Sequence, residues 1–419
     1  MVVVVEAAFY GDDFTGSTDA MVQFARVGLR AVLLVTLPSA PELRELAARY
    51  DVIGVAGIAR SLPPDEQEAE LRPVLEALRN LGPLVLQYKV CSTADSSPTR
   101  GSIGRALEIG RDVCGPAVVP ILIAQPELGR YTIFSHHFAA EAGTIYRLDR
   151  QPTMSTHPST PMHESDLRHH LSHQTTLPLT ALHLTTYPNL PTSHLPDTSG
   201  GVGAVVLDAL TDEDLRMLGP VILRDRSADE VRFVIGSGGM SRALGLALRP
   251  GGGVAGSGTS AVGGPVLVVS GSQSRRTAEQ IANVRAAGWT VLPLVDEASA
   301  RAMAAFSAGA EGVVVHTNGL GVDELGRVPG ALADVVRRVT AAAGVRRVVV
   351  AGGDTSGQVL RQLEVTSLEL AGSARPISPG VHLCRAASAV PALDGLEVLL
   401  KPGQLGEVDL FTEFQRWSG

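Results

Sequence analysis

Short apolar runs alternate with longer amphipathic segments along most of the chain, and this alternation constrains the fold more than any other feature. Runs at residues 2–9, 31–36, 52–58 and 84–88 have the composition of buried strands, with helical patterns among them. Parallel strands need such crossover helices, since a short turn can join only antiparallel strands. The sequence therefore predicts an α/β protein built from doubly wound, mostly parallel sheets with helices on both faces.

The alternation is interrupted once and then restarts, which indicates two domains. Residues 249–264 are glycine-rich and have the composition of a flexible linker. A length of 419 residues also fits two or three domains, at roughly 150 residues each. We therefore expect a first domain at residues 1–248 and a second at 265–419. Residues 127–196 are polar and rich in proline, and we interpret them as an elaborated loop region with a short helix at 164–172.

Composition argues against several classes of protein. A net charge of −8 and an aromatic content of 4% disfavour nucleic-acid binding, which uses basic surfaces and stacking rings. No apolar run approaches the ~18 residues of a membrane helix, and the first residues lack the basic start of a signal peptide. Three cysteines do not form a disulfide framework and fit a reducing compartment. We expect a cytoplasmic protein with no membrane or nucleic-acid partner.

Two short patterns match known motifs without the context that those motifs require. Gly251, Gly253 and Gly256 satisfy G-x-G-x-x-G, but no strand precedes them and no helix follows, so they do not predict a dinucleotide site. His169 and His173 have the spacing of metal ligands on a helix, yet no carboxylate or cysteine accompanies them at a suitable distance. A solvated helix face is the favoured interpretation of this histidine pair.

Polar loops follow two of the predicted strands in the first domain. Asp12 and Asp13 lie between a strand and a helix, where adjacent carboxylates can bind magnesium, bind a polyol or take a hydroxyl proton. A turn with a helix N-cap explains the same residues equally well. The loop at 89–101 joins Lys89, Arg100 and several hydroxyl side chains, and it suits an anionic, oxygen-rich small molecule. Lys89 and Lys401 are the only lysines of the chain.

The second domain has two glycine- and hydroxyl-rich loops after predicted strands, at residues 270–274 and 352–357. Glycines let backbone N–H groups approach phosphate oxygens, and a following helix favours an anion. Two such loops on one sheet suggest a nucleoside triphosphate. The chain has no Gly-Lys pair, so a Walker A loop is excluded. A third strand-end turn follows at residues 401–406.

Taken in order, these loops resemble the motifs of the four-carbon acid sugar kinases, ATP-dependent kinases of tetronates, 3-oxo-tetronates and related acid sugars such as oxo-isoapionate. The resemblance spans nearly the whole chain. Its motifs are Gly11-Asp12-Asp13-Phe14-Thr15-Gly16, Lys89 with Ser92 and Thr93, Gly129-Arg130, residues 157–162, Ser270-Gly271-Ser272, residues 352–357 and Lys401-Pro402-Gly403.

The resemblance implies that the first domain binds the acid sugar and the second binds ATP with Mg²⁺, with the active site in the cleft between the domains. It implies Asp12 and Asp13 as catalytic residues. Substrate would be bound by Asp12, Asp13, Lys89, Ser92, Asp95 and Arg130. The nucleotide would be bound by Ser270, Gly271, Ser272, Gly352, Gly353, Asp354, Thr355, Ser356 and Gly403.

The chain departs from the family pattern at two positions. Cys91 stands where many members have aspartate, and Asp95 is the candidate to replace that carboxylate. Asp354 stands where glutamate is common. Two alternatives to a kinase are a nicotinamide-dependent oxidoreductase of acid sugars and a non-catalytic sugar-acid binding protein. A homodimer is a further expectation about partners.

Overall fold

The computed structural model describes residues 5–192, 195–196, 201–224, 230–252, 263–317, 327–372 and 377–417. The chain divides into two compact units, the first made of Met1–Ala31 and Leu37–Ala255, the second of Val32–Thr36 and Gly256–Gly419. The segment Val32–Thr36 therefore belongs to the second unit, although it lies inside the 1–248 range expected for the first domain. Residues 253–262 of the predicted linker lie outside the described part of the chain.

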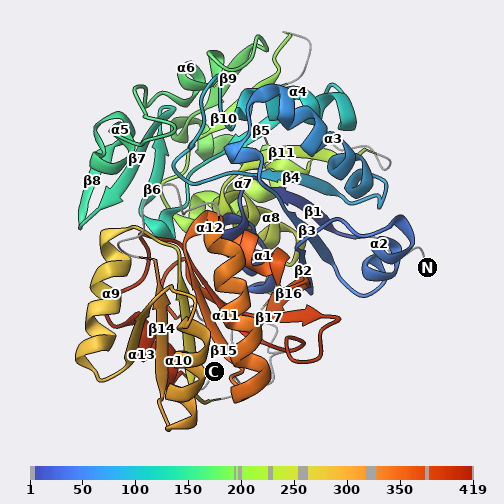
Figure 1. Cartoon of the computed structure of the whole chain (residues 1–419). Helices are drawn as coiled ribbons and strands as arrows, with labels where there is room; N and C mark the ends of the chain where they lie inside the picture. The colour runs from blue at the N-terminus through green and yellow to red at the C-terminus, as the bar shows by residue number, and fades with distance from the viewer. Residues whose placement is uncertain are drawn as a thin grey trace. The chain divides into compact units, whose positions relative to one another are not determined.

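The seven strands that the first unit contributes to the large sheet pair in parallel, and helices cover them in two groups (Figure 1). In spatial order the strands are β3 (Val52–Ala56), β1 (Ala7–Gly11), β4 (Val85–Lys89), β11 (Arg232–Gly236), β5 (Val119–Leu122), β10 (Ala204–Leu207) and β9 (Leu179–Leu182). One group of helices contains α1 (Phe14–Ala25), α7 (Asp212–Leu223) and α8 (Gly238–Leu248); the other contains α3 (Pro64–Arg79) and α4 (Ile103–Cys114). Helix α2 (Ala40–Ala47) packs against β3.

The region at 127–196 is more regular than the loop region that the sequence suggests. It contains a three-stranded antiparallel sheet of β6 (Arg130–Ile133), β7 (His136–Glu141) and β8 (Thr144–Arg147). Short helices follow as η3 (Leu148–Arg150), α5 (Pro152–Ser155), α6 (Leu167–Ser172) and η4 (Leu184–Thr192), after η2 (Pro126–Leu128). The turn between β6 and β7 places Phe134 and Ser135 at φ values of 51° and 67°. The buried Asp208 carboxylate accepts both of their N–H groups, at 2.7 and 2.9 Å, and holds this unfavourable turn.

The second unit combines five parallel strands with three antiparallel ones. Their order is β13 (Thr290–Pro293), β14 (Gly312–His316), β12 (Val266–Ser270), β15 (Arg347–Ala351), β18 (Glu397–Lys401), β17 (His382–Ser388), β16 (Val365–Leu370) and β2 (Ala31–Leu34). Helices α9 (Arg275–Ala286) and α13 (Leu410–Arg416) pack together, and α10 (Ala298–Ser307), α11 (Val328–Ala343) and α12 (Gly353–Gln362) form a second group. The expected α/β class with mostly parallel strands is confirmed.

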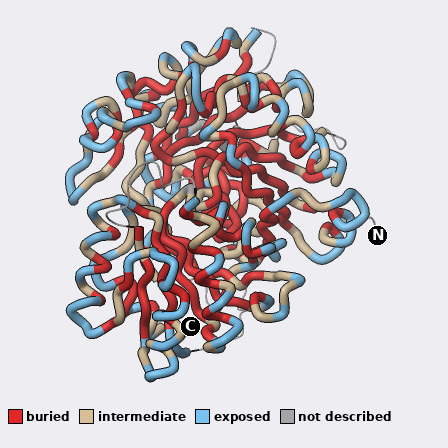
Figure 2. The backbone as a smooth tube through the Cα atoms, in the orientation of Figure 1, coloured by how far each residue is buried: buried red, intermediate tan, exposed pale blue. Residues whose placement is uncertain are grey.

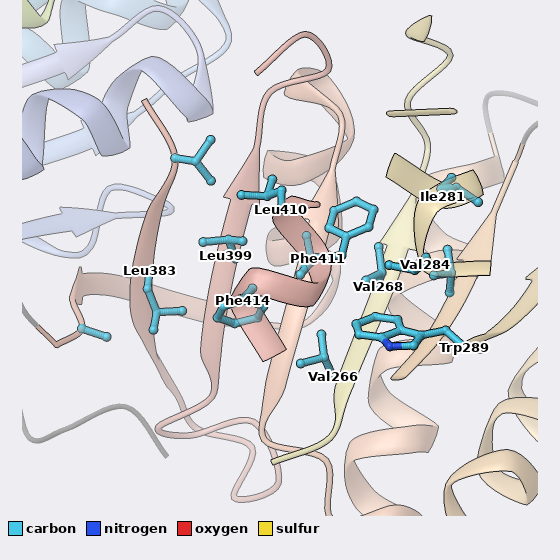
Figure 3. Packing of buried hydrophobic residues seen from close by; sticks show 14 residues of the cluster. Val266, Val268, Ile281, Val284, Trp289, Leu383, Leu399, Leu410, Phe411 and Phe414 are labelled. Atoms are coloured by element: carbon cyan, nitrogen blue, oxygen red, sulfur yellow. The ribbon is translucent and has the colours of Figure 1, made fainter. Parts of the chain in front are cut away.

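Burial of the central strands explains why they read as continuous apolar runs (Figure 2). In the second unit, alternate side chains of the strands meet apolar side chains of α9 and α13 (Figure 3). The Trp289 ring lies where a side chain on Gly312 would stand, since a Cβ there would be 2.1 Å from the ring. No described helix is both long and apolar enough for a membrane crossing.

Candidate active site

The carboxyl ends of three neighbouring strands bring the predicted acidic and basic residues of the first unit together. Strand β1 lies between β3 and β4, and Gly11 at its end is in register with Ala56 on one side and Lys89 on the other. The loops that follow these strands therefore share one edge. Asp12 and Asp13 follow β1, and Lys89 ends β4.

Arg60 joins this group, and the sequence interpretation did not include it. Its Nη2 and Nε donate to the two carboxylate oxygens of Asp12, at 2.8 and 3.2 Å. Its Nη1 donates to Asp13 Oδ2 at 2.9 Å and lies 3.9 Å from Asp95 Oδ2. Arg60 follows β3, the other neighbour of β1, so the rule that ligand-binding loops gather at strand ends could have found it.

The two adjacent carboxylates have opposite electrostatic environments. Burial raises the pKa of Asp12 to about 6. The positive charge of Arg60 opposes this rise, and the negative charge of Asp13 adds to it. Burial also opposes ionisation of Asp13, but Arg60 and Lys89 outweigh it and hold the pKa of Asp13 below its usual range. Asp13 also caps helix α1, accepting the Gly16 N–H at 2.8 Å. Asp13 therefore has the N-cap role, and Asp12, which has no such role, has the raised pKa.

Lys89 lies against the first turn of α1. It is 2% exposed, and its Nζ donates to the Val90 carbonyl at 2.9 Å. A Cβ on Gly16 would lie 2.9 Å from Lys89 Nζ and 2.4 Å from Asp13 Oδ1, so only glycine leaves room for this ion-rich contact. The ammonium contributes positive charge beside both carboxylates, as it lowers the pKa of each.

The loop after β4 is fixed by hydrogen bonds among its own side chains and by a buried histidine. Thr93 Oγ1 donates to Asp95 Oδ1 at 2.7 Å and lies 2.9 Å from Cys91 Sγ. Burial, with a smaller effect of Asp95, raises the pKa of Cys91 to about 11, so the thiol stays protonated and is a poor nucleophile. His137 Nε2 donates to the Ser92 carbonyl at 2.8 Å, and burial lowers the pKa of His137 to about 4. A neutral imidazole therefore anchors this loop.

Arg130 and Arg100 differ in their relation to the cluster. Arg130 Nη1 donates to the carbonyls of Leu128 and Ala140, at 2.9 and 3.0 Å. Its buried Nε has no partner among the described residues. Burial lowers the pKa of Arg130, and the charge of Asp95 is among the smaller effects that oppose this lowering. Arg130 thus lies within electrostatic reach of Asp95. Arg100 is exposed, and its backbone closes a turn with Ser97.

The predicted nucleotide loops of the second unit also meet at one edge. Strand β15 lies between β12 and β18, and Ala351 is in register with both Ser270 and Lys401. A Cβ on Gly271 would lie 2.5 Å from Thr355 Oγ1, so the loop after β12 touches the loop after β15 only because this residue is glycine. Gly352, at φ 124°, has the backbone conformation that glycine favours.

The hydroxyl groups of these loops fall into two types. Ser356 is buried and its Oγ donates to the Gly352 carbonyl at 2.6 Å, so it stabilises its own turn. Ser270 Oγ is fully buried and has no hydrogen-bond partner among the described residues. The side chain of Asp354 lies outside the described part of the structure.

Comparisons with known proteins agree with this division into two sites. Residues 7–244 match the family described as a sugar-binding N-terminal domain, and residues 267–411 match a nucleotide-binding C-terminal domain. The class defined by fold and sites is therefore a protein with a sugar-binding and a nucleotide-binding domain in one chain. The chain belongs to the four-carbon acid sugar kinase family.

Similar proteins support the family at full length. A 3-oxo-isoapionate kinase of Paraburkholderia graminis is 36% identical, over 96% of this chain and 93% of that protein. A 3-oxo-tetronate kinase of Methylobacterium radiotolerans is 30% identical, over 96% of both chains. A crystal structure from Salmonella typhimurium LT2, described as a candidate tRNA synthase, has a TM-score of 0.78 at 24% identity and 99% coverage of both chains. At that identity the likeness concerns the fold alone.

Proposed function

We propose that this protein is an ATP-dependent kinase that transfers the γ-phosphate of ATP to a hydroxyl of a small acid sugar. The acceptor is of the tetronate, 3-oxo-tetronate or branched oxo-isoapionate type, in line with the relatives named above. The observation that carries the proposal is the buried Asp12 carboxylate, held by Arg60 beside Lys89 at the strand ends of the sugar-binding unit. This arrangement offers both a proton acceptor and positive charge for a carboxylate.

Asp12 is the proposed base, or hydroxyl-orienting group, and Asp13 organises the site. A base works best when its pKa is near the working pH, and burial moves the pKa of Asp12 in that direction. The Asp13 carboxylate already accepts hydrogen bonds from the N-terminus of α1 and from Arg60. It also accepts one from the Thr15 hydroxyl, at 3.0 Å. Each Asp12 oxygen accepts one bond from Arg60 and keeps a second lone pair for a substrate hydroxyl.

The sugar carboxylate is assigned to the positive groups around this base. Lys89 and Arg130 provide these charges. Ser92 and Asp95, in the loop after β4, provide further polar groups for the substrate. Such local positive charge is needed because the chain as a whole has a net charge of −8.

ATP is assigned to the second unit, where the glycine-rich turns lie together at the ends of neighbouring strands, each followed by a helix. The unpartnered Ser270 hydroxyl is a donor for an oxygen that the protein itself does not supply. Mg²⁺ enters with ATP as its substrate complex, since this ion binds phosphate oxygens and water with only one or two carboxylates. The interdomain position of the active site and a homodimeric state stay predictions.

The test is an ADP-release assay with purified protein, Mg-ATP and a panel of four-carbon and branched acid sugars. We expect ADP release that depends on the acid sugar and is absent with neutral sugars of the same length, because the carboxylate is part of the recognition. Release that is independent of every acid sugar would contradict the proposal. Binding of a nicotinamide cofactor in place of ATP would favour the oxidoreductase alternative.

A further inference from the structure

Lys401 is a fully buried ammonium at the end of β18, and none of the carboxylates that the structure describes pairs with it. Its Nζ donates to Thr277 Oγ1 at 2.6 Å and to the Gly403 carbonyl at 2.9 Å. No described carboxylate lies within 4.0 Å of it. Lys89, the other lysine, is also buried and makes no ion pair within 4.0 Å among the described residues, but its charge lowers the pKa of both Asp12 and Asp13.

Keeping such a group in the interior is unfavourable, because a buried cation loses its hydration without gaining a paired anion. Burial lowers the pKa of Lys401 to about 7, and the like charge of Arg276 contributes further. A methionine of similar length would avoid this cost. The lysine therefore calls for an explanation other than stability of the free protein.

The hydrogen bonds of Lys401 connect it, through Thr277, to the predicted nucleotide loop at 270–274 and, directly, to the turn at 401–403. Thr277 Oγ1 lies 3.0 Å from Ser272 Oγ, which in turn lies 3.2 Å from Ser274 Oγ. Ser274 Oγ also donates to the carbonyl of Gly403. A Cβ on Gly403 would lie 3.1 Å from Ser272 Oγ, so the turn after β18 is in close contact with the loop after β12. Lys401 thus lies beneath the junction of these two loops.

We propose that Lys401 is a positioning residue for the nucleotide phosphates. Through Thr277 it fixes the orientation of the Ser272 hydroxyl, and through the Gly403 carbonyl it fixes the turn at residues 401–403. Its charge lies beside the loops assigned to the polyphosphate, and bound phosphate would supply the anion that no described side chain supplies. This inference rests on the proposed function, because it requires that these loops bind a nucleotide.

The test is calorimetric titration of the full chain with ADP and Mg²⁺ in the absence of any acid sugar. Lys401→Met is expected to weaken ADP binding by about 10- to 100-fold, the usual loss when a hydrogen-bonded charge is removed. In steady-state assays the same variant should raise KM for ATP by a similar factor and change kcat by less than about threefold. A purely structural role would lower stability and leave the KM of the folded fraction unchanged.

Variants of Thr277 test the route of the effect and do not depend on the Lys401 variant folding. Thr277→Val removes the hydroxyl and should weaken ADP binding, whereas Thr277→Ser keeps it and should retain most of the affinity. In the double variant K401M/T277V the losses should be clearly less than multiplicative, because both changes interrupt one network. Leu399→Met is the matched control, a core change in the same strand that should leave ADP affinity unchanged.

Three outcomes would overturn the inference. These are ADP affinity of folded Lys401→Met within threefold of the wild type, equal affinities of Thr277→Val and Thr277→Ser, and fully multiplicative losses in the double variant. The proposed function fails separately: a wild-type chain that binds ADP but phosphorylates no acid sugar would reject the kinase assignment and leave the role of Lys401 in nucleotide binding intact.

Discussion

The two sites use opposite means to bind polar ligands. At the strand ends of the first unit, charged side chains dominate, and Arg60 offsets the paired carboxylates Asp12 and Asp13. At the carboxyl ends of the strands of the second unit, glycine backbone and hydroxyl groups dominate, and the buried cation Lys401 has no described carboxylate within 4.0 Å. Among the described residues, the carboxylates of the first site therefore share a cationic partner, whereas the ammonium of the second site has no anionic one.

The difference fits the ligands that we assign. An acid sugar presents a carboxylate and hydroxyl groups, which charged and polar side chains can bind individually. A nucleoside triphosphate is a highly charged ligand, which backbone groups at helix N-termini and a buried positive charge can bind. Four predictions test this comparison.

The largest effect is expected for Asp12→Asn. Loss of the proposed base should lower kcat by about 10²- to 10⁴-fold, and the affinity for ADP should stay unchanged because the second unit binds it. Steady-state kinetics and ADP titration measure the two quantities. Asp149→Asn, which removes an acid paired with Arg147 outside the site, is the control. A fall in kcat of less than threefold for Asp12→Asn would reject Asp12 as the base.

The second largest effect is expected for Gly271→Ala. The added methyl group would lie 2.5 Å from Thr355 Oγ1 and force the two nucleotide loops apart. Overpacking of this kind should weaken ADP binding by about 10- to 100-fold. Gly330→Ala in α11 is the matched control, since a Cβ there meets no atom within 4 Å. If both variants bind ADP like the wild type, the loops are not the nucleotide site.

A smaller effect is expected when Arg60, which pairs with both Asp12 and Asp13, is replaced. Arg60→Met should lower kcat/KM for the acid sugar by about 10-fold or more, because it leaves the buried Asp12 and the partly buried Asp13 without their shared partner. Arg60→Lys keeps the charge but not the bidentate geometry, and it should fall between Arg60→Met and the wild type. If Arg60→Lys equals the wild type, only charge matters and the geometric part of the account is wrong.

The smallest effect is a shift in pH dependence. The base must be ionised, so kcat/KM should fall as the pH drops through the pKa of Asp12, near 6. In Arg60→Met this acid limb should move to higher pH, because the charge of Arg60 lowers the pKa of Asp12. Profiles of kcat/KM between pH 5 and 8 measure the acid limb of the wild type and that of the Arg60→Met variant. A flat wild-type profile, or a limb that moves to lower pH, would contradict the assignment.

Local sequence was sufficient for the class of fold and for part of the first site. Buried parallel strands are continuous apolar runs, and Asp12 and Lys89 could be placed because ligand-binding loops follow strand ends. Arg60 has no local motif, and its role depends on β3 lying beside β1. Knowledge of strand order, which a single sequence does not contain, was the missing information.

Other features depend on contacts between residues far apart in the sequence. The β6–β7 turn is held by Asp208, more than 70 residues later, so the sequence of the turn itself does not predict a strand pair. Likewise β2 pairs antiparallel with β16, and no local pattern indicates that an early strand belongs to the second unit. The Ser356 hydroxyl donates to the Gly352 carbonyl within its own turn, and its contact with the nucleotide, implied by the family resemblance, stays a prediction.

The most direct measurement follows the acceptor itself: the mass of each acid sugar after incubation with Mg-ATP and either the wild type or Asp12→Asn. The account predicts that at least one four-carbon or branched acid sugar gains a single phosphoryl group with the wild type and almost none with the variant. A wild-type protein that binds ADP yet leaves every acid sugar unmodified would contradict it, as would an Asp12→Asn variant that phosphorylates the sugar at the wild-type rate.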